Sequence, residues 1–201
     1  MEKRYGIITI GYNRIDSLRR LLDALNQAEY GTEKAILIIS LDYADMPEIV
    51  KLAEDYSWEH GEKHVHAYTE RQGLRQHILN CGDYIETYKL TAAAVFEDDV
   101  YPSPAYFNYM VQAVEFYGEN ENIAGISLYT HLWDEVYSRP FQPLLDRYDT
   151  FFMQYAQSWG QIWLPKQWKE FKNWYLNHSE TFREAPGIPP AVAKWKDSSW
   201  L

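Results

Sequence analysis

The feature that most constrains the fold is a set of short runs that are apolar throughout instead of alternating with polar residues. Three of them are Tyr5–Ile10, Ala35–Ile39 and Ala92–Phe96. A strand that is apolar on both faces needs cover on both faces, which is the situation of a parallel sheet between two layers of helices. The sequence therefore predicts an α/β fold.

Segments with helical periodicity separate these runs. Leu18, Leu21, Leu22 and Leu25 follow the spacing of one helix face, and Asp16 is the predicted N-cap of that helix. Right-handed crossovers between parallel strands give an open, doubly wound sheet. Ligands on such sheets bind at the carboxyl ends of the strands. We therefore expect the functional residues just beyond the strand ends.

The regular alternation ends near residue 130. Seven of the eight tryptophans follow that point, which predicts a change of architecture there. We divide one continuous domain into an α/β part, 1–130, and an aromatic-rich part, 131–201. A fifth strand is expected at Ile123–Leu128, a further strand at Phe151–Ala156, and a helix at Pro165–Leu176. The chain stops inside an aromatic segment, as a truncated polypeptide or a terminus packed against another surface would.

Charge and composition exclude several classes of protein. With 19 Lys and Arg against 29 Asp and Glu, the net charge is −10, which disfavours binding to nucleic acid or to anionic lipid. Cys81 is the only cysteine, so an internal disulfide is excluded. No apolar run is long enough for a transmembrane segment, and the N-terminus lacks a signal peptide. We expect a cytoplasmic protein, either free or peripheral at a membrane.

Polar residues follow three of the predicted strands, and the most charged of these places is the run Glu97-Asp98-Asp99. Carboxylates held so close together are unfavourable unless a cation or protons offset their charge. Hard oxygen ligands suit Mn²⁺ or Mg²⁺, which could also bridge the phosphates of a nucleotide. The alternative is a solvated acidic turn before the next helix. The buried strand that precedes the run favours the metal site.

Four segments in this order resemble the GT-A glycosyltransferases. Val95–Phe107 resembles the metal-binding segment of the N-acetylglucosaminyltransferase I type, with an apolar strand, an acidic run and an aromatic helix. Ile8–Arg14 and Ile38–Asp42 are similar to the first two strands of that family. Gln72–Gly82 is similar to a helix entry in the broader family-2 glycosyltransferases. The resemblance covers about residues 5–130 and implies a Rossmann-like GT-A fold in which residues 1–130 bind a nucleotide-sugar and the aromatic-rich part, 131–201, is the acceptor side.

The resemblance also implies roles for single residues. Asp99 would be the metal ligand, and Glu97 and Asp98 would face the donor sugar and ribose. Asp42 and Arg14 would hold the nucleotide base and its surroundings. The alternative is that Asp42 caps a turn and Arg14 is a surface charge. An acidic Asp42 accepting from the imide N–H of uracil would favour a UDP-sugar over a CDP- or GDP-sugar.

The catalytic base of an inverting transfer is predicted less directly. The resembled family has an aromatic Trp-Asp-Asp-Trp pattern there, and its nearest match, Trp195–Trp200, makes Asp197 the candidate. A surface aspartate is the alternative reading. Asp134, Asp146 and Asp149 are further candidates.

The predicted activity is metal-dependent transfer of a hexosyl or N-acetylhexosaminyl group from a UDP-sugar to an acceptor hydroxyl. The sequence does not distinguish a glycan, a lipid-linked or a protein acceptor. Two alternatives remain: a sugar-phosphate nucleotidylyltransferase, and a non-catalytic module of the same fold that binds a glycan or nucleotide. The loop after the first strand, with one glycine and no lysine, disfavours the nucleotidylyltransferase because those enzymes grip a triphosphate there.

Overall fold

The computed structural model describes residues 3–134, 138–154 and 157–179. Its centre is a six-stranded sheet with the strand order β3-β2-β1-β4-β8-β5. The strands are β1 (Tyr5–Gly11), β2 (Ala35–Leu41), β3 (Lys63–Ala67), β4 (Ala92–Glu97), β5 (Ile126–Ser127) and β8 (Gln161–Trp163). A separate two-stranded ribbon pairs β6 (Trp133–Asp134) with β7 (Arg139–Pro140).

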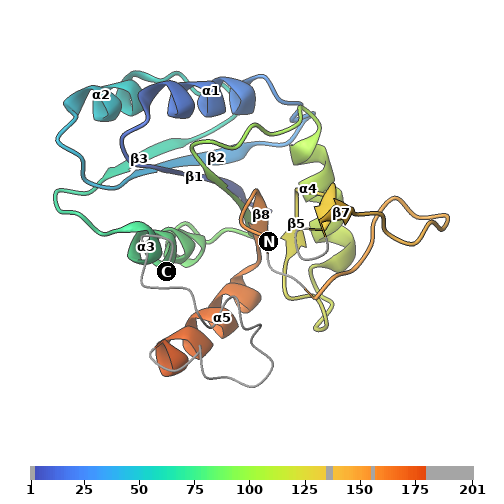
Figure 1. The fold of residues 1–201 in the computed structure, drawn as a ribbon. Coiled ribbons are helices and arrows are strands. Elements are labelled where there is room, and N and C mark those ends of the chain that lie inside the picture. Colours follow the sequence, from blue (N-terminus) through green and yellow to red (C-terminus); the bar gives the residue numbers. More distant parts are fainter. Residues whose placement is uncertain (1–2, 135–137, 155–156, 180–201) are drawn as a thin grey trace.

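Helices cover both faces of the sheet, as the apolar strands predicted (Figure 1). The helices are α1 (Ile15–Asn26), α2 (Pro47–Asp55), α3 (Leu74–Thr87), α4 (Tyr106–Tyr117) and α5 (Pro165–His178). Side chains of α1, α2 and α4 share one core cluster with the sheet, whereas those of α3 and α5 share a second cluster. The chain is therefore a three-layer α/β structure, and the predicted fold class is confirmed.

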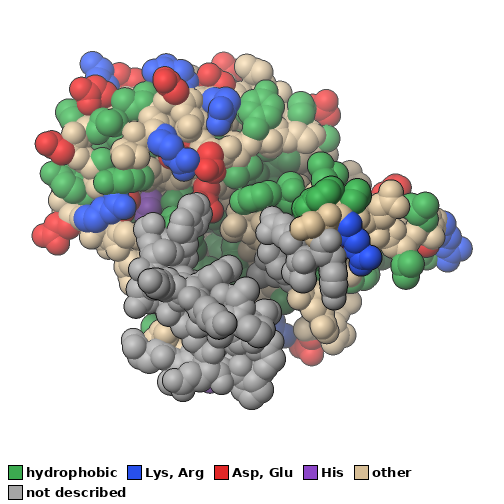
Figure 2. Space-filling view, in the orientation of Figure 1, with side chains coloured by type: hydrophobic (Ala, Val, Ile, Leu, Met, Phe, Trp, Pro, Cys, Tyr) green, Lys and Arg blue, Asp and Glu red, His purple; other side chains and the backbone are tan. Residues whose placement is uncertain are grey.

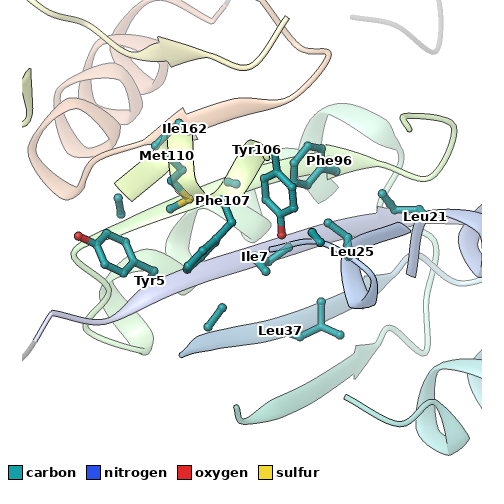
Figure 3. Close-up of a cluster of buried hydrophobic side chains, with 14 of the residues drawn as sticks. Tyr5, Ile7, Leu21, Leu25, Leu37, Phe96, Tyr106, Phe107, Met110 and Ile162 are labelled. Carbon is teal, nitrogen blue, oxygen red and sulfur yellow. The ribbon is translucent and has the colours of Figure 1, made fainter. Parts of the chain in front are cut away.

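Neighbouring residues of one strand supply the two cores. Ile7 and Leu37 belong to the cluster under α1 and α4, where Figure 3 shows them with Phe107 and Met110. Ile8 and Ile38 belong to the other cluster. This alternation follows from the two-residue period of a strand and explains why both β1 and β2 are fully buried.

The order in which the chain adds strands to the sheet reverses at β1. Parallel pairing leads outward from β1 to β2 and then to β3, whereas β4 pairs in parallel on the opposite side of β1. This reversal creates a topological switch point between β1 and β4, and open α/β sheets bind their ligands at the carboxyl ends of strands at such points. The connectivity thus directs attention to the residues that follow β1 and β4.

The second half of the chain differs from the sequence prediction. Residues 151–154 are irregular, residues 155–156 lie outside the described residues, and the strand of this region is β8. Ile162 of β8 is fully buried, whereas Phe152 is 70% exposed, so burial and not apolar character separates the two segments. The predicted strand at Ile123–Leu128 shortens to β5. β8 runs antiparallel between β4 and β5, and it brings the aromatic-rich part into the main sheet.

Two surface properties complete the fold. Acidic and basic side chains are interspersed over the layer of α1 and α2 in Figure 2, so the negative net charge is not gathered into one patch there. In the described part of the chain, every helix falls short of the length and apolar character needed to cross a membrane.

Candidate functional site

The ends of three neighbouring strands meet at one edge of the sheet. β1 ends at Gly11, and backbone hydrogen bonds tie the residues after β2 and β4 to it. The Asp42 amide donates to the Gly11 carbonyl (2.9 Å), and the Asp98 amide donates to the Ile10 carbonyl (3.0 Å). The structure therefore places the segments bearing Arg14, Asp42 and Asp98 at the switch point of the sheet, one beside the other.

Arg14 lies between β1 and the acidic run. It is the N-cap residue of α1; the predicted cap, Asp16, falls in the first turn instead. The Arg14 guanidinium pairs with Asp98, and its Nη1 donates to Asp99 Oδ2 at 3.0 Å. The Asp98 side chain is 3% exposed and that of Asp99 is 50% exposed. One cation thus compensates a buried and an exposed carboxylate.

Burial raises the pKa of two carboxyl groups in this acidic run. It raises the pKa of Glu97, which is half-buried at the end of β4, and the charges of Asp99 and Asp98 raise that pKa further. Burial also raises the pKa of Asp98, against the opposing effect of the Arg14 charge and its hydrogen bond. Three carboxyl groups thus follow one another at the end of β4, and Arg14 pairs with two of them.

Asp42 is a buried anchor for the loop before α3. Its Oδ1 accepts from the amides of Tyr43 (2.8 Å) and Gln72 (2.7 Å), and its Oδ2 accepts from the Gly73 amide (3.0 Å). Arg71 Nε lies 3.2 Å from the same Oδ2. Four donors of the chain engage a group with about four lone-pair sites. Asp42 therefore fixes the backbone around Arg71, and its predicted contact with a base stays a prediction.

Arg71 and Tyr12 form a pair that the sequence did not single out. The Arg71 guanidinium carbon lies 3.5 Å from the centre of the Tyr12 ring, in a cation–π arrangement. Tyr12 follows β1 directly and is partly exposed. Only the three-dimensional contact joins these two residues, because 59 positions separate them along the chain. We call Tyr12, Arg14, Asp42 and Arg71 the charged side of the site.

Asp99, which pairs with Arg14, also lines an aromatic cavity. Its volume is about 620 Å³. The lining residues come from the loop after β4, from α4 and from the segments flanking β5 and β8; they are Phe96, Asp99, Val100, Tyr101, Pro102, Ser103, Ala105, Tyr106, Tyr109, Leu128, Tyr129 and Trp159. Asp99 is the one charged side chain among these residues. Asp99 thus borders two unlike surfaces.

The predicted catalytic base, Asp197, lies outside the described residues. Of the other candidates, Asp134 lies in β6 at 3.8 Å from Arg139, and Asp146 accepts a hydrogen bond from the Tyr148 amide at 2.7 Å. Asp149 is exposed. Neither the cavity lining nor the charged side includes any of these three. The assignment of the base therefore remains a prediction.

The acidic run offers some, but not all, of the ligands of a divalent cation. Asp99 is half-exposed, and its oxygens are the hard donors that Mn²⁺ and Mg²⁺ prefer. Within residues 3–134, 138–154 and 157–179, no group of three or more His, Cys, Asp and Glu side chains is placed to hold a metal ion. A cation at Asp99 would therefore need further oxygen ligands from a bound molecule, and the phosphates of a nucleotide are suitable ones.

Comparison with known proteins places the fold. No protein-family profile matches the sequence, and no curated protein matches it. Among solved structures, a cytidylyltransferase from Leptospira borgpetersenii serovar Hardjo-bovis is similar with a TM-score of 0.51 and 11% identity, over 86% of this chain and 65% of that one. This likeness and the sheet topology show a mixed α/β, Rossmann-like fold of the GT-A kind.

Two further solved structures are similar over smaller portions. A mannosyltransferase from Pyrobaculum calidifontis, solved with GDP-Man and Mn²⁺, has a TM-score of 0.48 and 16% identity, over 63% of this chain and 35% of that one. S. aureus TarS 1–349 has a TM-score of 0.46 and 11% identity, over 57% of this chain and 33% of that one; it has also been solved with UDP-GlcNAc. The chain spans about a third of the length of these two proteins.

Proposed function

We propose that this chain binds a nucleoside diphosphate sugar, specifically a UDP-sugar, and transfers the sugar to an acceptor hydroxyl. The observation that carries the proposal is the convergence of Arg14, Asp42 and Asp98-Asp99 at the switch point between β1 and β4. The fold, shared with the cytidylyltransferase, supports it.

Two parts of the charged side suit parts of such a donor. Tyr12, which is partly exposed and contacts Arg71 through its ring, offers an aromatic surface for a base. Arg14 and the first-turn amides of α1 offer positive charge to a diphosphate. A hollow of about 350 Å³ opens beside them, lined partly by Asn13 and Ser17.

The transfer itself is a substitution at the anomeric carbon. The acceptor oxygen forms a bond to that carbon, the bond to the diphosphate breaks, and the nucleoside diphosphate leaves. A base takes the hydroxyl proton, and Asp197 is our candidate. A divalent cation held by Asp99, when bound, would neutralise charge on the leaving diphosphate. Arg14 lies on the same side and would hold Asp99 in place beside the cation, because it pairs with both aspartates.

A donor screen tests this proposal. UDP-, CDP- and GDP-sugars are added to the purified chain with Mn²⁺, and both thermal stabilisation and release of nucleoside diphosphate are measured. We expect a UDP-sugar to stabilise the chain most and to be turned over with a suitable acceptor. Stabilisation without turnover for every donor would support a non-catalytic binding module. Failure of all donors to stabilise the chain would contradict the proposal.

A sugar-phosphate nucleotidylyltransferase is the second candidate, because the solved structure with the highest TM-score of the three compared is a cytidylyltransferase. Such an enzyme must hold a triphosphate, yet the loop Gly11–Arg14 carries one glycine, one arginine and no lysine. Release of pyrophosphate from CTP or UTP with a sugar phosphate would favour this candidate. Release of nucleoside diphosphate from a UDP-sugar would favour the transferase.

A further inference from the structure

The aromatic cavity has a chemistry unlike that of the charged side. Apolar carbon dominates its surface, yet the hydroxyl groups of Tyr101, Tyr109, Tyr129 and Ser103 belong to lining residues. Its volume of about 620 Å³ lies within the range of small-molecule sites, about 300–1,000 Å³. Figure 2 shows hydrophobic side chains gathered around α4 and β7, near this part of the molecule. The cavity is therefore suited to a ligand with apolar faces and polar edges.

The wall of the cavity includes aromatic side chains that other parts of the chain hold in place. The rings of Tyr129 and Trp159 meet edge to face, with centroids 4.9 Å apart. Trp159 keeps 51% of its surface exposed. Phe96 and Tyr106 are buried beneath and meet edge to face at 5.3 Å. A half-exposed ring on a rigid floor offers a platform for the apolar face of another ring.

Gly160, next to Trp159, lets the backbone pack closely against Phe96 and Leu128. Its φ of +82° is strained for any residue with a side chain, and a Cβ there would lie 3.1 Å from both Phe96 Cε1 and Leu128 Cβ. The Gly160 carbonyl also accepts from the Leu128 amide at 2.8 Å. The backbone next to Trp159 is thus held close to the cavity by a glycine that no other residue replaces without strain.

Charge narrows the class of ligand. Among the described lining residues the sole charge is the carboxylate of Asp99, and none of these residues is a lysine, arginine or histidine. Without a cation bound at Asp99, a phosphorylated or carboxylated ligand would find no positively charged side chain among these lining residues and would meet the carboxylate of Asp99. A sugar ring without charge has the matching chemistry, because it presents C–H faces to aromatic rings and hydroxyls to tyrosine and serine.

We propose that the aromatic cavity binds the acceptor of the transfer as an uncharged glycoside, with one sugar ring stacked on Trp159. The proposal rests on the proposed function. It assigns this ring to the acceptor because the lining comes from the loop after β4, from α4 and from the segments around β5 and β8, whereas the proposed nucleotide surface follows β1 and β2. Asp99 lies where the two surfaces meet, so an acceptor hydroxyl can approach the donor there.

Saturation-transfer NMR on the full chain tests the proposal. The probes are methyl glycosides of glucose, galactose, mannose and N-acetylglucosamine in both anomeric forms, with glucuronic acid and glucose 6-phosphate as charged counterparts. We expect at least one neutral glycoside to bind, and both charged sugars to bind more weakly. Binding of the charged sugars as tight as that of the best neutral glycoside, or no binding by any glycoside, would overturn the proposal.

Matched variants locate the binding. Trp159→Ala should lower the affinity for the glycoside by about tenfold. Tyr101→Ala is a second test that disturbs folding less, because the Tyr101 ring is more exposed. Trp174→Ala is the control, because Trp174 is exposed on α5 and does not line the cavity. Glycoside binding that both cavity variants leave unchanged would overturn the proposal.

Nucleotide titrations separate this proposal from the proposed function. UDP affinity with Mn²⁺ should be the same in the parent chain, Trp159→Ala and Trp174→Ala. If UDP fails to bind to any of them while glycoside binding depends on Trp159, the donor assignment fails and the cavity assignment stands. If Trp159→Ala weakens a UDP-sugar and leaves free glycosides unaffected, the cavity belongs to the donor sugar and the proposal is wrong.

Discussion

The charged side and the aromatic cavity share a neighbour in Asp99, and they are built in different ways. Hydrogen bonds hold the charged side: Asp42 accepts three backbone amides, and Arg14 pairs with both aspartates. Ring contacts and one glycine hold the cavity. The charged side is thus fixed by polar contacts between side chains and backbone, whereas the described lining of the cavity is mostly aromatic and apolar.

The largest expected effect is on the charged side. Asp42→Ala should destabilise the chain by about 2–4 kcal/mol, because it removes the acceptor of three backbone amides and the partner of Arg71. Urea unfolding measures the change. Asp45→Ala is the control, since Asp45 is exposed three residues away, and it should change stability by less than about 0.5 kcal/mol. Equal stability of the two variants would show that Asp42 is no anchor.

A smaller effect is expected at the cavity. Gly160→Ala should lower the free energy of unfolding by about 1–3 kcal/mol, because Gly160 combines a positive φ with a close approach to Phe96 and Leu128. Gly31→Ala isolates the backbone part: Gly31 also has a positive φ, but its Cβ would meet nothing within 4 Å. We expect Gly160→Ala to lose more stability than Gly31→Ala, and glycoside binding to fall while UDP affinity stays. A larger loss in Gly31→Ala would contradict this account of the cavity.

The smallest effect concerns Glu97, the last residue of β4. Burial, Asp99 and Asp98 raise its pKa above the ordinary value of 4.5. A raised folded-state pKa means that the favourable contribution of Glu97 is complete below its ordinary pKa and is lost as pH rises through the folded-state pKa. Glu97→Gln, which mimics the protonated acid, should therefore be more stable than the parent chain at pH 7.5. The two should converge as pH falls below 4.5.

Unfolding free energies at pH 7.5 and pH 4 check this prediction. Glu54→Gln, at an exposed position of α2, corrects for the general loss of one negative charge. A parent chain more stable than Glu97→Gln at pH 7.5, or an advantage of the variant that is the same at both pH values, would show that Glu97 is not held in a desolvated, negatively charged environment.

The two sides also differ in how far the sequence predicts them. Apolar strands and helical periodicity predict the alternating β and α elements up to α4, and with them the edge that carries Arg14, Asp42 and the acidic run. The carboxyl ends of parallel strands fall at one edge whatever the details of the loops, so position in the chain is informative there. Even so, the pair of Tyr12 and Arg71 needs the fold, because the contact joins two different loops.

The cavity could not be predicted from the sequence, and the reason is physical. Both Phe152 and Ile162 lie in short apolar segments, yet only Ile162 enters the sheet. Its segment follows Gly160, whose positive φ lets the chain turn against the core, and local pattern does not show which of two such runs will pair with β4. β8 is also antiparallel, so the rule of parallel βαβ units does not apply to it.

The most direct test of the central claim is a calorimetric titration of the purified chain with UDP, in the presence and absence of Mn²⁺. The central claim is that Asp99 joins a divalent cation and a nucleoside diphosphate at the switch point. Asp99→Asn keeps the size of the side chain and removes its charge; Asp55→Asn, at the end of α2, is the matched control. We predict Mn²⁺-dependent binding of UDP to the parent chain and to Asp55→Asn, weakened by about tenfold or more in Asp99→Asn. Equal UDP affinity of the parent chain and Asp99→Asn in Mn²⁺ would contradict the claim.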